Sequence, residues 1–98
     1  MKQITATELE KLLNDGKAVN LIDVRETDEV ESGKIPGAVN IPLGLIEFRI
    51  QDLDKSLEYI LICRSGGRSS RAAEFLESRG FNVVNMTGGM LSWNGAIE

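Results

Sequence analysis

Two short, almost wholly apolar runs constrain the fold of this chain more than any other feature. They are AVNLIDV, residues 18–24, and EYILIC, residues 58–63. A strand with one face in water alternates apolar and polar residues, whereas these runs are nearly continuous, which predicts strands buried on both faces. Such strands are typical of parallel sheets that carry helices on either side.

Patterns typical of helices and of further strands surround these two runs. Thr7 followed three residues later by Glu10 is a capping-box pattern, which predicts a helix that begins at Thr7 and ends at Asp15-Gly16. The segment SSRAAEFLESRG predicts an amphipathic helix that begins near Ser69 and ends at Gly80. The other expected elements are strands at 3–5, 38–41 and 81–86, an acidic helix across 26–33, a helix across 43–50 with Leu45, Ile46 and Ile50 facing inward, and a short terminal helix across 88–93.

This alternation of strands and helices predicts an α/β fold, a sandwich whose central sheet is mostly parallel. A length of 98 residues favours a single domain over residues 1–98. Ligands in such folds bind at the carboxyl ends of the strands. Three polar transitions fall at expected strand ends, at 23–25, 63–69 and 87–89, and they mark the expected site.

Composition excludes several classes of function. The formal net charge of −4 argues against general nucleic-acid binding, which needs a basic face. No apolar run approaches the roughly 20 residues of a membrane span, and the N-terminus lacks the apolar core of a signal peptide. The chain has one cysteine and no histidine. We therefore expect no internal disulfide, no metal site, no cofactor and a reducing, cytoplasmic location.

The only cysteine, Cys63, closes a predicted buried strand and opens the loop CRSGGRSS. Gly66 and Gly67 let the loop curl, so that successive backbone N–H groups can point inward as an anion nest. The start of the next helix adds partial positive charge, and Arg64 and Arg68 add full charges. These effects favour thiolate over thiol, which makes Cys63 a credible nucleophile without a histidine base. The candidate anion-binding loop consists of Arg64, Ser65, Gly66, Gly67, Arg68 and Ser69.

Simpler roles exist for several of these residues. A lone cysteine at a strand end can be a small buried apolar residue, but the surrounding loop favours a reactive thiol. Arg71 and Arg79 are expected to be solvated helix charges. Gly88-Gly89 can border the site or only permit a tight turn, and the turn is the simpler role. Met90 and Trp93 are expected to anchor the terminal helix to the core.

The sequence resembles the single-domain rhodaneses, a family of thiosulfate sulfurtransferase-type domains. Three segments carry the resemblance: LIDVRETDEVESGKIPGAVNIP, CRSGGRS and GGMLSW, in this order and across nearly the whole chain. The residues of the first signature that are in place are Asp23, Arg25, Glu29, Gly33, Ile35, Pro36, Gly37, Ala38, Asn40 and Pro42. Lys34 departs from the histidine that the family often has. The resemblance implies a three-layer α/β fold around a five-stranded parallel sheet, with Cys63 as the nucleophile.

Cysteine phosphatases also hold a cysteine in a loop of N–H groups, but their loop reads cysteine, five residues, arginine. Four residues separate Cys63 from Arg68, and seven separate it from Arg71. A shorter loop is a smaller cradle, which suits one sulfur atom better than a tetrahedral phosphate. No phosphate-binding string of the form G-x-x-x-x-G-K-[ST] is present either.

The expected function is that of a sulfurtransferase. Cys63 would take the outer sulfur of thiosulfate or of a persulfide donor and pass it to a thiol or to cyanide. Arg64 and Arg68 would orient the anionic donor. One alternative is a protein-to-protein persulfide carrier with little activity on free thiosulfate, and another is a non-catalytic regulatory module. The short loop suggests an exposed pocket that could admit a protein partner.

Two further residues are expected to support the site from behind. Asp23 and Arg25 end the strand that should lie beside the Cys63 strand. We expect Asp23 to hold the active loop through backbone contacts, since a carboxylate touching the sulfur would raise the pKa of the cysteine. We expect Arg25 to pair with Glu29.

Overall fold

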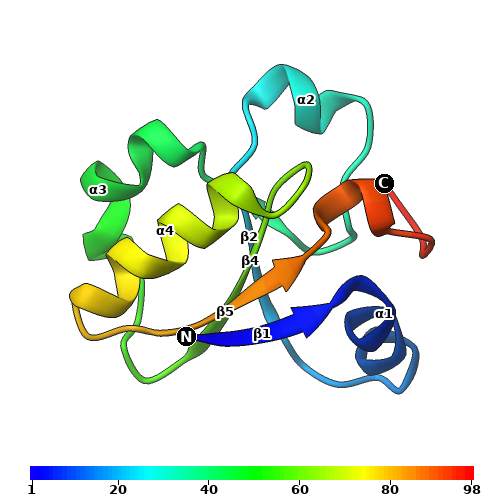
Figure 1. Cartoon of the computed structure of the whole chain (residues 1–98), viewed down its shortest axis with the longest axis horizontal. Coiled ribbons are helices and arrows are strands. Elements are labelled where there is room, and N and C mark those ends of the chain that lie inside the picture. Colours follow the sequence, from blue (N-terminus) through cyan, green and yellow to red (C-terminus); the bar gives the residue numbers. More distant parts are fainter.

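A computed structural model describes residues 1–98 and contains one five-stranded sheet in which all strands are parallel (Figure 1). The strand order across the sheet is β1-β5-β4-β2-β3. The strands are β1 (Lys2–Thr5), β2 (Asn20–Asp23), β3 (Val39–Asn40), β4 (Glu58–Ile62) and β5 (Asn82–Thr87). The expectation of a central, parallel sheet of five strands is confirmed.

Helices cover both faces of this sheet. The helices are α1 (Ala6–Asn14), α2 (Thr27–Glu31), α3 (Ile46–Arg49) and α4 (Gly67–Ser78), with short 3-10 segments η1 (Leu43–Leu45), η2 (Ile50–Asp52) and η3 (Gly89–Ser92). α3 and α4 lie on one face and α1 on the other (Figure 1). This arrangement is a three-layer α/β sandwich, as the sequence predicts. None of the helices has the length and apolar character that crossing a bilayer requires.

The apolar runs supply side chains to two separate cores. In β4, Leu61 packs into the cluster under α4, whereas Ile60 and Ile62 pack into the cluster under α1. In β2, Ile22 and Leu21 divide in the same way. Because successive side chains of a strand point to opposite faces, only a strand that is apolar at every position can serve both cores.

Helix α1 begins two residues earlier than its capping pattern predicts. Its N-cap is Thr5, whose side chain accepts from the backbone N–H of Glu8, while the Glu8 side chain accepts from the N–H of Thr5. The prediction of Thr7 as the cap is wrong, because the sequence contains the same pattern twice. β1 ends at Thr5 and leaves no room for a loop before the helix.

The segment between β3 and β4 is less regular than a single helix. It consists of η1, α3 and η2 in succession. Ile46 is buried and Ile50 packs against the core, as expected, but Leu45 is 47% exposed, so its predicted inward orientation is wrong. Leu45 is the last residue of η1 and Ile46 is the first of α3, so no single helical period runs through both residues.

The carboxyl ends of the central strands meet at one edge of the sheet. Asp23 at the end of β2 pairs with Ile62 at the end of β4. Asn85 on β5 pairs with Leu61 on the other side of β4. Cys63 therefore leaves the sheet between the end of β2 and the last residues of β5.

Candidate active site

The site is centred on the sulfur of Cys63, which lies directly after β4. Cys63 is 1% exposed and is the only cysteine. Its Sγ accepts a hydrogen bond from the backbone N–H of Gly66 at 2.9 Å and lies 3.3 Å from the hydroxyl oxygen of Ser69. Arg64 and Ser65, the next two residues of the loop, are exposed, whereas Cys63 itself is buried.

Two opposing effects act on the thiol. Burial raises the pKa of Cys63, because a low-dielectric surrounding disfavours the anion. Hydrogen bonds from the Ser69 hydroxyl and from the backbone N–H groups of Ser69, Gly66 and Ser65 lower it, and together they prevail. The pKa of Cys63 thus lies below its ordinary value. The loop stabilises the anionic sulfur mainly through uncharged donors.

Those donors are free because of how α4 begins. Gly66 precedes the helix with φ of +107°, a conformation that glycine adopts without steric cost. The first main-chain bond of the helix runs from Ser70 N–H to the Gly66 carbonyl. The N–H groups before Ser70 have no partner within the helix, and that of Ser69 is among those that act on the sulfur.

A second segment, η3, braces the loop from behind. The N–H groups of Met90 and Leu91 donate to the carbonyls of Cys63 and Arg64, at 2.9 and 3.0 Å. Gly89 has φ of +58°, and a Cβ on it would lie 2.4 Å from the carbonyl carbon and oxygen of Arg64. Gly89 is therefore required for this close approach and does more than permit a turn. Because these carbonyls point toward η3, the N–H groups of the loop can face the sulfur.

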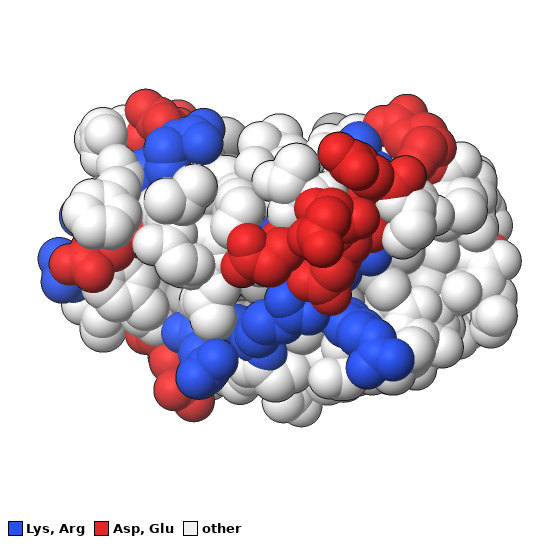
Figure 2. Space-filling view, turned by 90° about the horizontal axis from the view of Figure 1, so that it is seen from above, with Lys and Arg blue, Asp and Glu red and all other residues white.

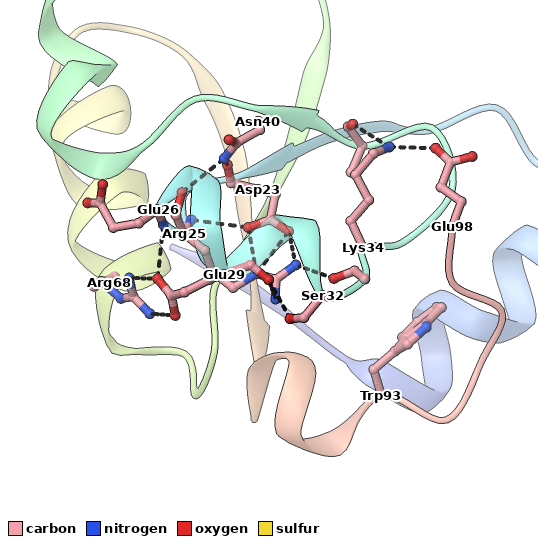
Figure 3. A network of polar contacts seen from close by, with 12 residues as sticks. Asp23, Arg25, Glu26, Glu29, Ser32, Lys34, Asn40, Arg68, Trp93 and Glu98 are labelled. Carbon is pink, nitrogen blue, oxygen red and sulfur yellow. Dashed lines mark hydrogen bonds and ion pairs between the residues drawn. The ribbon is translucent and has the colours of Figure 1, made fainter.

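Arg68 is not a free cation at the mouth of the site. Its guanidinium makes two hydrogen bonds to the carboxylate of Glu29 on α2, at 2.6 and 2.8 Å (Figure 3). Hydrogen bonds from the Arg68 side chain and from the Glu26 backbone lower the pKa of Glu29 to about 2. The same carboxylate raises the pKa of Arg68. This pair ties α2 to the first turn of α4.

Asp23 and Arg25 form a buried ion pair that holds the segment around α2 (Figure 3). Arg25 donates from Nη2 to Asp23 at 2.8 Å and to the carbonyl of Gly33 at 2.8 Å. Asn40 donates to the backbone carbonyls of both residues at 2.9 Å.

Two expectations about this pair are wrong. Arg25 reaches only the backbone carbonyl of Glu29, at 3.4 Å, because its guanidinium is occupied by Asp23. The side chain of Asp23 accepts from the backbone N–H and the guanidinium of Arg25 and makes no contact with the sulfur, as expected, but it makes no hydrogen bond to the active loop. The pair acts on the site indirectly, by fixing the segment that carries Glu29.

The side chains of Arg64 and Arg71 make no hydrogen bond or ion pair within the chain, and both residues are exposed. Figure 2 shows acidic side chains gathered over α2, with a row of basic side chains beside them. Lys34, where the family often has histidine, pairs with Glu98. Arg64 is thus the unpaired cation that directly adjoins Cys63 in the chain.

Sequence reasoning missed one residue that contacts the loop from β5. Asn85 is 4% exposed, and its amide reaches both the Ser69 hydroxyl and the Gly66 carbonyl. The sequence feature that could have pointed to Asn85 is its position as a polar residue within the mostly apolar strand run FNVVNM. Met90 and Trp93 pack against the core under α1, as predicted.

The arrangement of β4, loop and α4 matches that of known proteins. Residues 5–96 match the model of the "Rhodanese-like domain" family. The chain belongs to the rhodanese-like domain family. A Bacillus subtilis protein named "Putative sulfurtransferase YtwF" is 43% identical over 98 residues, which is 100% of this chain and 95% of that protein.

Two further similarities extend this comparison. The B. subtilis "Putative sulfur carrier protein YrkF" is 38% identical over 97 residues, covering 98% of this chain and 52% of that protein. The crystal structure of a rhodanese-like domain protein from Staphylococcus aureus has a TM-score of 0.94 and 37% identity, and the match covers 100% of this chain and 97% of that one. The family and the fold implied by the sequence motifs are therefore confirmed.

The brace by η3 is tested by Gly89→Ala. The added Cβ collides with the Arg64 backbone, so we expect a loss of about 2 kcal/mol or more in the free energy of unfolding, measured by urea denaturation. Gly44→Ala is the matched control, since a Cβ there meets nothing within 4 Å, and it should change the stability little. Equal stabilities of the two variants would contradict the brace.

The Glu29–Arg68 pair is tested by pH. The pKa of Glu29 falls from 4.5 to about 2 in the folded chain, so its contribution is fully present above pH 4.5 and is lost as pH falls toward 2. The difference in unfolding free energy between wild type and Glu29→Gln should therefore shrink over this range in urea titrations. Glu47→Gln, on α3 and without an ion pair, is the control and should show no such trend. A difference for Glu29→Gln that is constant with pH would refute the role of the pair.

Proposed function

We propose that residues 1–98 act as one rhodanese-like domain that transfers sulfane sulfur through a persulfide on Cys63. The observation that carries this proposal is a single buried sulfur that faces backbone N–H groups at the start of a helix. The name of the relative YtwF points to the same class of reaction.

The first step is the attack of the Cys63 thiolate on the outer sulfur of thiosulfate or of a persulfide donor. A new S–S bond forms at Cys63, the S–S bond of the donor breaks, and the leaving group keeps that electron pair. The leaving group is sulfite from thiosulfate or a thiolate from a persulfide. The enzyme then carries one extra sulfur with a negative charge on its outer atom.

The loop suits that charge because its donors are already in place. Backbone N–H groups of Ser65, Gly66 and Ser69 act on the thiolate before any sulfur is transferred. Donors fixed in advance require no reorganisation when the charge arrives, which is the principle of an oxyanion hole. In the second step a thiolate or cyanide attacks the outer sulfur, and the electron pair of the broken S–S bond returns to Cys63.

The burial of Cys63 restricts the donor. A residue that is 1% exposed can be reached only by an atom at the tip of a narrow group. The outer sulfur of thiosulfate or of a persulfide is such an atom, because it is bonded on one side only. We assign the orientation of an anionic donor to Arg64, which has no partner, and not to Arg68, which is held by Glu29.

A protein-to-protein sulfur carrier is the second candidate. The relative named as a sulfur carrier favours it, as does the exposed Leu91 beside Arg64, whose carbonyl accepts from Leu91 N–H. An apolar side chain next to an unpaired arginine suits contact with another protein. The chemistry at Cys63 is the same in both candidates, and only the donor and acceptor differ.

Mass spectrometry after exposure to thiosulfate tests the proposal. The wild type should gain one sulfur atom at Cys63, and Cys63→Ser should gain none and should lose all turnover with thiosulfate and cyanide. Gain of sulfur from a persulfide donor with little turnover on thiosulfate would favour the carrier. If neither donor adds sulfur to the wild type, the proposal fails and a non-catalytic module remains.

A further inference from the structure

The hydroxyl of Ser69 lies among three acceptors. Its oxygen is 2.5 Å from Oδ1 of Asn85, 3.2 Å from the carbonyl oxygen of Gly66 and 3.3 Å from Sγ of Cys63. A serine hydroxyl carries a single hydrogen, so it can donate fully to only one of these acceptors at a time. Its contact with Asn85 is much the shortest.

The contact with the Ser69 hydroxyl is the shorter of the two hydrogen bonds that the Asn85 side chain makes. Asn85 is 4% exposed on β5, between the buried residues Val84 and Met86. Its amide nitrogen reaches the Gly66 carbonyl only at 3.5 Å, so the bond to Ser69 is its principal one. Burying an amide costs free energy unless it is hydrogen-bonded, so an apolar side chain at this core position would be the more stable one.

We propose that Asn85 is a positioning residue that competes with Cys63 for the single hydrogen of the Ser69 hydroxyl. When Asn85 holds the hydrogen, backbone N–H groups alone stabilise the anionic sulfur. When the hydroxyl turns to the sulfur, the anion gains one more donor. Asn85 thereby limits how strongly the loop stabilises the thiolate.

This competition has a consequence for reactivity. A thiolate becomes a weaker nucleophile as its pKa falls, and the best attacking thiol has a pKa near the ambient pH. If the loop bound the anionic sulfur too tightly, Cys63 would be fully ionised but would attack its substrate slowly. The inference rests on the proposed role of Cys63 as the reacting thiolate, but it does not depend on which group Cys63 attacks.

Titration of Cys63 by the ultraviolet absorbance of its thiolate tests the proposal without any sulfur donor. Because Cys63 is the only cysteine, Cys63→Ser provides the blank. Asn85→Leu removes the nearer of the two competing acceptors and leaves only the more distant Gly66 carbonyl, so the pKa of Cys63 should fall by about half a unit, roughly a threefold rise in the ratio of thiolate to thiol. Ser69→Ala removes the donor and should raise the pKa.

The double variant shows whether Asn85 acts through the hydroxyl. In the Ser69→Ala background, Asn85→Leu should have no further effect on the titration. Asn85→Ala gives the same expectation with a smaller side chain, should leucine not fit the strand. Asn82→Ala, on the exposed start of β5, is the matched control and should leave the pKa unchanged.

The proposal is overturned if the Asn85 variants raise the pKa or leave it unchanged. It is also overturned if their effect persists without the Ser69 hydroxyl. Since no sulfur is transferred in this titration, these outcomes are independent of the mass-spectrometric test. A chain that fails to form a persulfide can still show the competition in the titration. A chain that forms a persulfide can equally fail to show it.

Discussion

The contact between the Cys63 sulfur and the N–H groups of its loop is the interaction on which the rest of the site depends. It exists because β4 ends at the centre of the sheet and only four residues separate its end at Ile62 from the start of α4 at Gly67. A helix that starts so soon leaves its first N–H groups close to the end of the strand. The sulfur occupies the position that an anion takes at other helix N-termini.

The neighbouring elements hold the loop in that conformation. η3 follows β5, which lies beside β4, and it turns the carbonyls of Cys63 and Arg64 away from the sulfur. On the other side, the Asp23–Arg25 pair fixes the segment that carries Glu29, and Glu29 holds Arg68. Each support comes from a different strand end, so the parallel order of the sheet is what brings them together.

Much of this architecture could be predicted from the sequence. The apolar runs predicted the parallel sheet because strands buried on both faces are apolar at nearly every position, whereas strands with one face in water alternate apolar and polar residues. The loop that follows Cys63 was identified as the candidate site because the chain has only one cysteine, and glycines and arginines follow it. The number of strands, five, came from the resemblance to the family motifs and not from the apolar pattern.

The errors have a common physical origin. Arg25 has several acidic neighbours in sequence, and only the fold decides that Asp23 is buried beside it while Glu29 faces Arg68. Asn85 looks like a surface residue until the register of β5 places it under the loop. The exposure of Leu45 goes with a change from 3-10 to α geometry directly after this residue. In each case the deciding partner is distant in sequence or set by backbone geometry.

The central claim is that folding, through these N–H groups, lowers the pKa of Cys63. The most direct test is to follow the rate of Cys63 alkylation against pH in the native chain and in urea, with the same small reagent. The account predicts a lower midpoint in the native chain than the value of about 8.5 expected when it is unfolded. A native midpoint equal to or above the unfolded one would show that burial outweighs the loop, and would contradict the account.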